Sequence, residues 1–209
     1  LHNTRSPILN SMLPPWRSPI TRALQRNRSL PNARYVQLAT IDRHNRPKNR
    51  TVVFRGWLEP VSQLKFVTDI RSQKALDLLA DNPTSNHNWA EICWYFPKTR
   101  EQFRVSGKLV LVTVNCDIDR YCKARQEAWQ QISDAGRIQF DWATPGADLI
   151  SDLDAVNPTQ PDLQQPLDNF CLLLLTPVAV DHLDLRGERQ SRYRYELVAD
   201  EWGMKSINP

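Results

Sequence analysis

The sequence predicts a mainly β protein, an antiparallel barrel with peripheral helices. Segments rich in β-branched and aromatic residues outnumber the segments with a helical pattern. Most of these segments follow one another through short turns, as antiparallel strands do. The chain also lacks the regular strand–helix alternation of a parallel sheet.

The N-terminal third is expected to hold an arm, a helix and three strands. Residues 1–17 predict an extended arm, and Ser18 is expected to cap a helix with Pro19 in its first position. Residues 33–41 alternate polar and apolar side chains and predict a strand. Residues 50–58 and 64–69 predict two more strands, which we expect to pair as a hairpin.

The middle of the chain predicts a helix, two strands and a second helical region. Residues 72–83 read "SQKALDLLADNP", with Ser72 as the expected cap and Pro83 as the stop. Residues 89–96 and 101–112 predict strands joined by a basic turn. Residues 117–133 predict a helix that begins near Asp117.

The C-terminal third predicts a long loop and three strands. Residues 140–169 are rich in Asp, Pro and Gln and lack a period, so we expect a surface loop. The segments "NFCLLLLTPVAVDHLDL", "SRYRYELV" and "EWGMKSINP" predict the strands.

Size and composition suit one domain spanning residues 1–209. The chain has 209 residues, of which 41% are hydrophobic, enough for a single core. The formal net charge of +4 is a mild excess, which fits a bound anionic ligand better than a nucleic-acid surface. The longest apolar run, residues 170–175, is too short to cross a bilayer, and we expect a cytoplasmic protein without membrane contact.

Several common sites are absent from the sequence. It contains no GxGxxG, no GxxxxGK[ST] and no GxSxG, which argues against a Rossmann site, a P-loop and a nucleophile elbow. The four histidines are scattered, so no metal site is expected. No CxxC occurs, and we expect free, mostly buried thiols at Cys93, Cys116, Cys122 and Cys171.

A group of basic residues predicts a phosphate pocket. Arg50 opens a predicted strand, and Lys74 lies in the first turn of the helix that Ser72 caps. A helix start, a hydroxyl and two cations together suit a phosphate group. The alternative is that these cations are surface charges paired with Asp69, Asp77 or Glu59.

Gln102 is a second candidate contact. Alternation places Gln102 and Arg104 on one face of their strand, and Phe103 and Val105 on the other. A side-chain amide offers a donor and an acceptor, which suits the edge of a heterocycle. The alternative is an ordinary surface Gln on a strand.

The order of three runs resembles a known family. "RTVVFRG", then "FVTDIRSQK" with its helix, then "WYFPKTREQFRVSGK" resemble the pyridoxamine 5′-phosphate oxidase-like family of flavin-binding split barrels, in particular a branch often found in cyanobacteria. The resemblance covers residues 15–140 and, more loosely, "SRYRYEL" near the C-terminus. It implies an antiparallel split β-barrel of the FMN-binding type.

The resemblance also implies the ligands and their contacts. The protein would be an FMN-binding homodimer with two sites at the subunit interface, and Gln102 would reach the flavin ring from the second subunit. Arg194, and less closely Ser133, match flavin-contacting positions. The remaining implied cofactor contacts are Arg50, Thr51, Val52, Val53, Phe54 and Arg55 along the flavin, with Thr68, Ser72 and Lys74 at the phosphate or ribityl chain.

The implied substrate site is less complete than the flavin site. Arg55, Tyr121 and Arg125 match positions that bind a small phosphorylated substrate. Gln73 stands where the family has a phosphate-binding cation, which Arg71 is a candidate to replace. Leu183 stands near the expected tryptophan, and the family's C-terminal Arg-x-His pair has no clear match. The flavin site therefore looks retained and the substrate site remodelled.

Three functions follow from these observations. The first is an FMN-dependent oxidase or reductase, in which the flavin does the redox chemistry and no catalytic side chain is required. The second is a carrier or sensor that binds FMN without turnover. The third is an anion- or nucleic-acid-binding barrel that uses Trp16, Trp57 and Trp94 as stacking surfaces.

Overall fold

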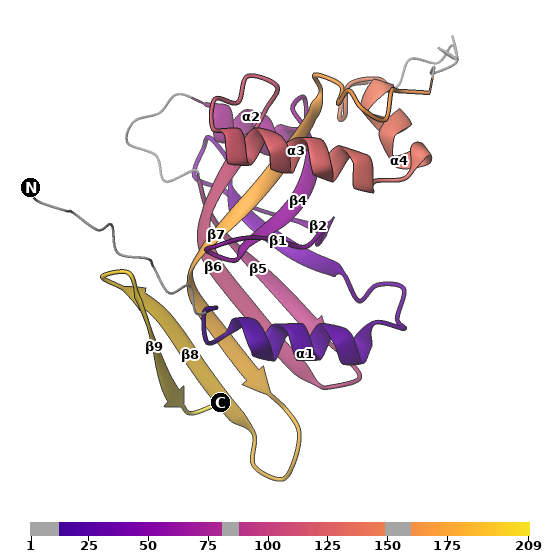
Figure 1. Ribbon diagram of the computed structural model, residues 1–209. Coiled ribbons are helices and arrows are strands. Elements are labelled where there is room, and N and C mark those ends of the chain that lie inside the picture. The colour runs from indigo at the N-terminus through magenta and orange to yellow at the C-terminus, as the bar shows by residue number, and fades with distance from the viewer. Residues whose placement is uncertain (1–12, 81–87, 149–159) are drawn as a thin grey trace, which may run out of the picture.

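The computed structural model describes residues 13–80, 88–148 and 160–209 (Figure 1). All strand pairs are antiparallel, and the strands form one sheet in the order β2-β1-β5-β6-β7-β4-β3, with β8 beside β7 and β9 beside β8. The expected β architecture is confirmed. The strands are β1 Tyr35–Ile41, β2 Pro47–Val53, β3 Trp57–Leu58, β4 Gln63–Asp69, β5 Trp89–Phe96, β6 Glu101–Val112, β7 Phe170–Asp184, β8 Ser191–Val198 and β9 Glu201–Ile207.

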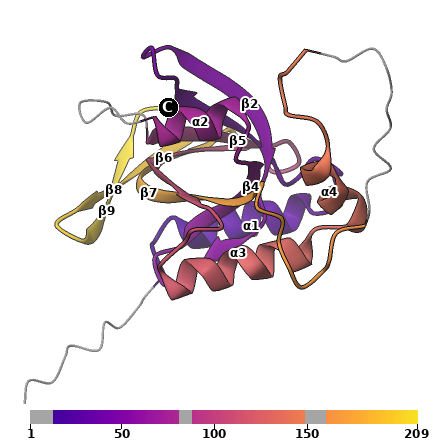
Figure 2. The same ribbon diagram turned by 90° about the horizontal axis from the view of Figure 1, so that it is seen from above.

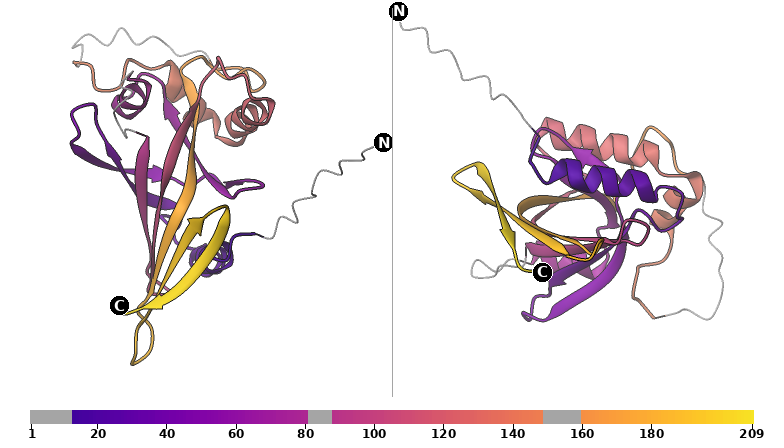
Figure 3. Two further views of the ribbon diagram at one scale, coloured as in Figure 1. Left: turned by 90° about the vertical axis from the view of Figure 1, so that its left-hand side faces the viewer. Right: turned by 90° about the horizontal axis from the view of Figure 1, so that it is seen from below.

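Strand β7 is where the sheet divides. Its first part pairs with β4 and its last part with β8, while β6 follows it along both parts. The β8–β9 hairpin therefore projects from the barrel, as both views of Figure 3 show. A β-bulge between Ser106 and Gly107 of β6 lies where the second partner of β7 changes from β4 to β8. A Cβ on Gly107 would lie 2.0 Å from the carbonyl oxygen of Thr176, so this close approach requires glycine.

The helices lie around the barrel rather than within the sheet. They are α1 Arg17–Asn27, α2 Gln73–Leu79, α3 Asp119–Gln131 and α4 Asp134–Ile138, followed by the 3₁₀ turn η1 Gln139–Asp141. In Figure 1, α2, α3 and α4 lie at one end of the barrel and α1 at the other, and Figure 2 shows the strands curving around a common interior.

Two hydrophobic clusters stabilise this arrangement. The larger fills the barrel and includes Phe54, Trp94 and Phe103. The smaller packs α3 onto β6 and β7 through Trp129, with Phe140 and Phe170 beside it. Burial of this much aromatic surface is the main favourable contribution to folding.

Two predictions about the first helix and the arm before it are wrong. Helix α1 begins at Arg17 with Trp16 as its cap, so Ser18 and Pro19 lie inside the first turn. Trp16 is fully buried against Trp57 and Trp202, which fixes the start of the helix and ends the arm before residue 16. Helix α3 has its cap at Ile118, next to Asp117, which agrees with the expected start.

Residues 50–58 form two strands instead of one. β2 pairs with β1, and only Trp57–Leu58 pairs with β4, so the expected hairpin joins β3 to β4. Between them the backbone N–H of Phe54 donates to Arg34 beside β1, and that of Arg55 donates to Lys65 on β4. This crossing segment closes the barrel between its two edges.

The predictions for the loop and the cysteines hold only in part. The described parts of 140–169 contain the end of η1 and no strand, and Pro83 lies outside the described residues. Cys116 and Cys122 form a disulfide, so free thiols were predicted wrongly there, while Cys93 and Cys171 are free. Burial raises the pKa of the Cys171 thiol to about 11. Within the described ranges, no helix is long and apolar enough to span a membrane.

Candidate functional site

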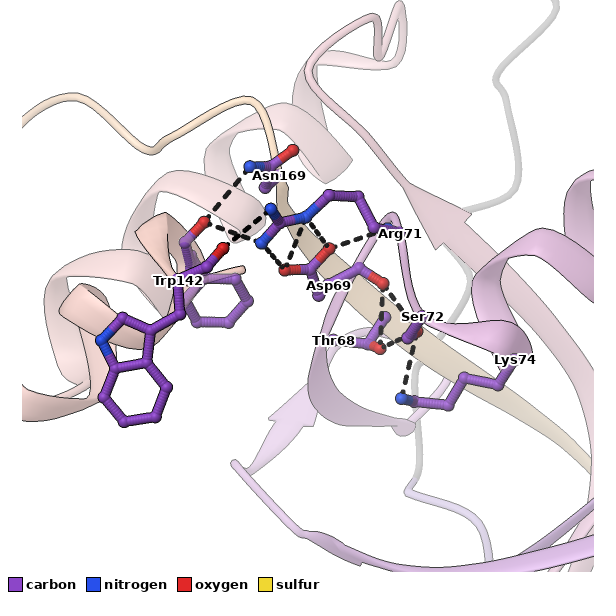
Figure 4. A network of polar contacts seen from close by, with 8 residues as sticks. Thr68, Asp69, Arg71, Ser72, Lys74, Trp142 and Asn169 are labelled. Carbon is purple, nitrogen blue, oxygen red and sulfur yellow. Dashed lines mark hydrogen bonds and ion pairs between the residues drawn. The ribbon is translucent and has the colours of Figure 1, made fainter. Parts of the chain in front are cut away.

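The turn from β4 into α2 places two hydroxyls and a cation together (Figure 4). The Oγ1 of Thr68 and the Oγ of Ser72 are 3.0 Å apart, and both residues are buried. The Nζ of Lys74 donates to the Oγ of Ser72 at 3.3 Å. Hydrogen-bonding groups from three residues therefore lie close together at this end of the barrel.

Ser72 occupies the cap position of α2, but its side chain does not cap the helix. Its hydroxyl donates instead to the carbonyl oxygen of Asp69 at 2.6 Å. The helix has only seven residues, so its dipole is a poor basis for anion binding. Side-chain cations and hydroxyls, rather than the helix start, carry the site.

Arg50 approaches the same region from β2. It lies opposite the buried Leu38 of β1, so its side chain is directed toward the inner side of the sheet. Its Nη1 donates to the Oγ1 of Thr40 at 2.6 Å and to the carbonyl oxygen of Leu38 at 3.2 Å. These bonds hold the guanidinium in place without neutralising it. We call Arg50, Thr68, Ser72 and Lys74 the cationic cradle.

The two cations of the cradle act on each other. Burial lowers the pKa of Lys74, and the positive charge of Arg50 lowers it further. Burial also lowers the pKa of Arg50, which the nearby charge of Asp77 partly offsets. Two desolvated like charges are unfavourable unless an anion joins them.

Surface ion pairing does not explain these cations. Asp69 pairs with Arg71, and Glu59 pairs with Arg17. Asp77 accepts a hydrogen bond from Gln73 at 2.9 Å. Among the described residues, neither Arg50 nor Lys74 forms an ion pair with a carboxylate, so the cradle retains unneutralised positive charge.

The rest of the predicted 50–55 stretch divides between the two sides of the sheet. Val52 and Phe54 are buried on the inner side with Arg50. Thr51 lies opposite Gln37, and both are exposed on the outer face, with Val53 on the same face. Arg55 follows the strand and is exposed.

Gln102 lies where alternation places it, on the outer face of β6. Phe103 and Val105 are fully buried, while Gln102 and Arg104 are half-buried. Gln102 lies between Tyr95 of β5 and Leu183 of β7. Arg194 of β8 faces the same side, and its Nε lies 2.8 Å from the Oε1 of Glu196.

The outer face also carries a set of paired charges. Asp181 of β7 accepts hydrogen bonds from Arg192 at 2.8 Å and from Arg104 at 3.2 Å, and Arg104 also lies 3.9 Å from Glu91. Burial alone would raise the pKa of Asp181, but the bonds from Arg192 and the charge of Arg104 lower it. We call these four residues the sheet-face ion pairs.

The residues predicted to bind substrate differ in burial and in their contacts. Arg125 is buried, and its guanidinium donates to the carbonyl oxygens of Phe170 at 2.9 Å and Leu167 at 2.8 Å. Tyr121 is half-buried, with its hydroxyl 3.3 Å from the Nε2 of Gln63. Arg125 therefore uses two of its N–H groups to hold backbone in place, and its expected substrate contact stays a prediction.

Two other expectations for the site change. Ser133 caps α4 by accepting from the N–H of Gly136 at 3.2 Å. Arg71 does not replace the missing phosphate cation, because Asp69 binds its guanidinium through both carboxylate oxygens. Sequence reasoning missed Thr40, which holds Arg50. Asp69 was named as a possible partner of the cations, and the Asp-x-Arg spacing at 69–71 was the signal that it pairs with Arg71.

The tryptophans do not form a stacking surface for bases. Trp16 and Trp94 are fully buried, and Trp57 packs against the core. Arg17 covers the ring of Trp57 at 3.7 Å from its centroid. This arrangement disfavours the nucleic-acid-binding alternative.

Comparisons with known proteins agree with this architecture. The family described as "Pyridoxamine 5′-phosphate oxidase, FMN-binding domain" matches residues 13–113. Pyridoxine/pyridoxamine 5′-phosphate oxidase 2 of Arabidopsis thaliana is 34% identical over 198 residues, which cover 93% of this chain and 97% of the relative.

Solved structures give the same result. A pyridoxamine 5′-phosphate oxidase-related, FMN binding protein from Nostoc punctiforme PCC 73102 is 51% identical, with a TM-score of 0.87 over 95% of this chain and 100% of the other. PhzG from Burkholderia lata 383 has a TM-score of 0.67 at 20% identity, covering 93% of this chain and 90% of the other, a likeness of fold alone.

Proposed function

The chain belongs to the pyridoxamine 5′-phosphate oxidase family of FMN-binding flavoproteins, and on this premise we propose that it is an FMN-dependent oxidoreductase. The observation that carries the site assignment is the cationic cradle. Arg50 and Lys74 lie close enough to lower the pKa of Lys74, and neither has a carboxylate partner among the described residues. A phosphate monoester would neutralise both.

The cradle residues fit the phosphate of FMN. A phosphate carries up to two negative charges near pH 7 and several acceptor oxygens. Arg50 and Lys74 supply charged donors, and Thr68 and Ser72 would supply neutral ones once Ser72 turns its O–H from the carbonyl oxygen of Asp69 toward the ligand. In this proposal, Thr40 holds the guanidinium of Arg50 through the 2.6 Å bond, so that little ordering is needed on binding.

FMN supplies the redox chemistry when bound, and the chain binds and orients it. Val52 and Phe54 restrict the space beside Arg50, and Gln102 offers a donor and an acceptor to the edge of the flavin ring. Arg55 and Tyr121 are proposed to contact a small phosphorylated substrate. Arg125 is not included, because backbone carbonyls already bind its guanidinium.

We also propose that the site is shared between two subunits. Arg50 and Thr68 are directed to the inner side of the sheet, whereas Gln102, Arg194, Thr51 and Val53 lie on its outer face. One copy cannot easily present both faces to one flavin. Tyr35 and Tyr95 are about half exposed on the outer face, as expected for residues that a second copy covers.

Mixed dimers test the shared site directly. Arg50→Met and Gln102→Ala would each weaken both sites of a homodimer. In a mixed dimer of the two variants, one site would carry both substitutions and the other neither. We expect one FMN per mixed dimer at wild-type affinity, measured by flavin fluorescence on doubly tagged protein. Two weak sites and no tight one would contradict sharing.

Turnover distinguishes the oxidoreductase from a carrier or sensor. Anaerobic mixing of the FMN-loaded protein with pyridoxamine 5′-phosphate should bleach the flavin absorption if this amine is a substrate. Photoreduction of the same sample is the control that the bound flavin can be reduced. The contacts of Arg125 with backbone favour a carrier or sensor function. That function would be supported if no phosphorylated amine or alcohol reduced a bound flavin that photoreduction does reduce.

A further inference from the structure

The cationic cradle is connected to the segment that follows α4. The connection runs through Asp69 and Arg71, in the turn between β4 and α2 (Figure 4). We propose that Arg71 is a positioning residue that couples occupancy of the cradle to the order of residues 139–147. The proposal rests on the proposed function, because it takes the phosphate of FMN as the group that fills the cradle.

Asp69 takes part in both ends of the connection. Its backbone carbonyl accepts from the hydroxyl of Ser72 at 2.6 Å and from the N–H of Ser72 at 3.1 Å. Its carboxylate accepts from the Nη2 of Arg71 at 2.7 Å and from the Nε at 3.0 Å. A shift of Ser72 toward a ligand would therefore move the residue that orients Arg71.

Arg71 in turn holds two backbone carbonyls distant in sequence. Its Nη1 donates to the oxygen of Trp142 at 2.9 Å, and its Nη2 donates to the oxygen of Phe140 at 3.2 Å. The hydrogen bonds that Arg71 donates to Asp69 raise the pKa of Arg71, so the guanidinium stays charged. Backbone carbonyls at the end of a helical turn lack partners within the turn, and the charged N–H groups of Arg71 supply these hydrogen bonds at the end of η1.

The other described end of the 140–169 region meets the same turn. The side-chain amide of Asn169 donates to the oxygen of Phe140 at 3.2 Å. The backbone N–H of Ile70 donates to the oxygen of Asn169 at 2.9 Å. The turn between β4 and α2 thus binds backbone from both sides of this region, and Phe140 adds a buried ring in the smaller hydrophobic cluster.

Such a connection must work in both directions. If filling the cradle stabilises the Asp69–Arg71 turn, then an ordered turn must also favour filling the cradle by the same factor. Loss of the guanidinium would leave the carbonyls of Phe140 and Trp142 without their charged donor. Both the order of residues 139–147 and the affinity for FMN should then fall together.

The chain offers a matched control. Arg186 and Asp184 form the same Asp-x-Arg pair, with Nε to Oδ1 at 2.9 Å and Nη2 to Oδ2 at 2.6 Å. That pair lies at the end of β7 and the start of the following connection. The guanidinium also lies 3.7 Å from Glu101, and it contacts no backbone carbonyl of residues 139–147. Arg186→Met therefore removes an equivalent local pair without touching the proposed connection.

The experiment combines hydrogen exchange with ligand binding. Amide exchange in peptides covering 139–147 is measured for wild type, Arg71→Met and Arg186→Met, each with no ligand, riboflavin or FMN. We expect FMN, but not riboflavin, to slow exchange there in wild type and Arg186→Met, and to have little effect in Arg71→Met. Arg71→Met should also weaken FMN about fivefold or more, with riboflavin affinity unchanged.

Two results would overturn the coupling. One is exchange at 139–147 that does not respond to FMN in wild type; the other is equal FMN affinity in Arg71→Met and Arg186→Met. A third result would instead contradict the proposed phosphate site: FMN would bind to Arg50→Met as tightly as to wild type. Circular dichroism of Arg71→Met checks that its fold is retained. Arg71→Lys keeps the positive charge but not the planar guanidinium, and should recover only part of the affinity for FMN.

Discussion

In the cationic cradle, neither Arg50 nor Lys74 has an ion-pair partner among the described residues, and burial and the charge of Arg50 lower the pKa of Lys74. In the sheet-face ion pairs, Arg104 and Arg192 enclose Asp181, and hydrogen bonding to Asp181 raises the pKa of Arg192. Both regions place arginine on a strand of the same sheet. Only the first retains positive charge available to a ligand.

The difference shows what identifies an anion site. A count of basic residues does not separate the two regions, because each contains two: Arg50 and Lys74 in the cradle, Arg104 and Arg192 in the ion pairs. The partners separate them: a carboxylate at 2.8 Å makes a structural pair, whereas hydroxyls and carbonyls hold a cation without cancelling its charge. Substitutions in the cradle should therefore affect binding, and those in the ion pairs should affect stability.

The largest expected effect is on cofactor binding. Lys74→Met should weaken FMN by roughly 10- to 100-fold, because a charged hydrogen bond to phosphate contributes about 1.5–3 kcal/mol. The apo protein should not lose stability at pH 7. Since the folded-state pKa of Lys74 is lowered, folding disfavours its charged form, and a neutral residue removes that cost. Fluorescence titration and urea unfolding measure the two quantities.

The second effect should fall on stability alone. Asp181→Asn keeps the shape of the side chain but leaves Arg192 without its carboxylate partner and Arg104 with only the more distant Glu91, and should lower the free energy of unfolding by roughly 1 kcal/mol. Because the folded-state pKa of Asp181 is lowered, its contribution is present above the unfolded pKa and is lost as the pH falls through the folded pKa. Urea unfolding of wild type and variant should therefore converge in acid. If the variant were as stable as wild type at pH 7, the sheet-face ion pairs would not contribute to stability, and the proposed difference between the two regions would be wrong.

A third effect concerns the pH dependence of binding. Phosphate favours charged Lys74, so bound FMN should raise the pKa that burial and Arg50 lower in the apo protein. Wild-type affinity should therefore fall as the pH rises through the apo pKa of Lys74, with protons taken up on binding in that range. Calorimetry in two buffers of different ionisation enthalpy measures the uptake. Lys74→Met should lose this alkaline decline, and its persistence would assign the titration to another group.

The smallest effect should come from the neutral donors of the cradle. Thr68→Val keeps the branched shape and removes the hydroxyl that lies 3.0 Å from Ser72. We expect FMN to bind roughly 2- to 10-fold more weakly, because a neutral hydrogen bond contributes about 0.5–1.5 kcal/mol. A loss as large as that of Lys74→Met would mean that charge does not dominate the cradle.

Much of this contrast was predictable from local sequence. Alternation along residues 101–112 placed Gln102 and Arg104 outside and Phe103 inside, because strand periodicity is a local property. The same holds for Lys74 near Ser72, two positions apart in one turn. A phosphate pocket that also includes Arg50 was predicted, and the charge of Arg50 acts on Lys74 in the fold.

The remaining features depend on contacts between distant residues. Arg71 was considered as a phosphate cation, but it binds the carbonyls of Phe140 and Trp142, which lie 69 and 71 positions away. Arg125 was assigned to substrate, and the carbonyls that bind it lie 42 and 45 positions away. The sequence does not show whether a guanidinium binds a ligand or a backbone carbonyl, because the residue is arginine in both cases. Only the folded structure shows which acceptors it contacts.

The most direct test of the account compares FMN with riboflavin, which lacks the phosphate. The affinity ratio of the two ligands is measured for the wild type and for the double variant Arg50→Met, Lys74→Met. The account predicts that wild type prefers FMN strongly and that the double variant loses most of this preference, with riboflavin affinity nearly unchanged. If the substitutions weakened both ligands equally, or neither, the cationic cradle would not be the site of the phosphate.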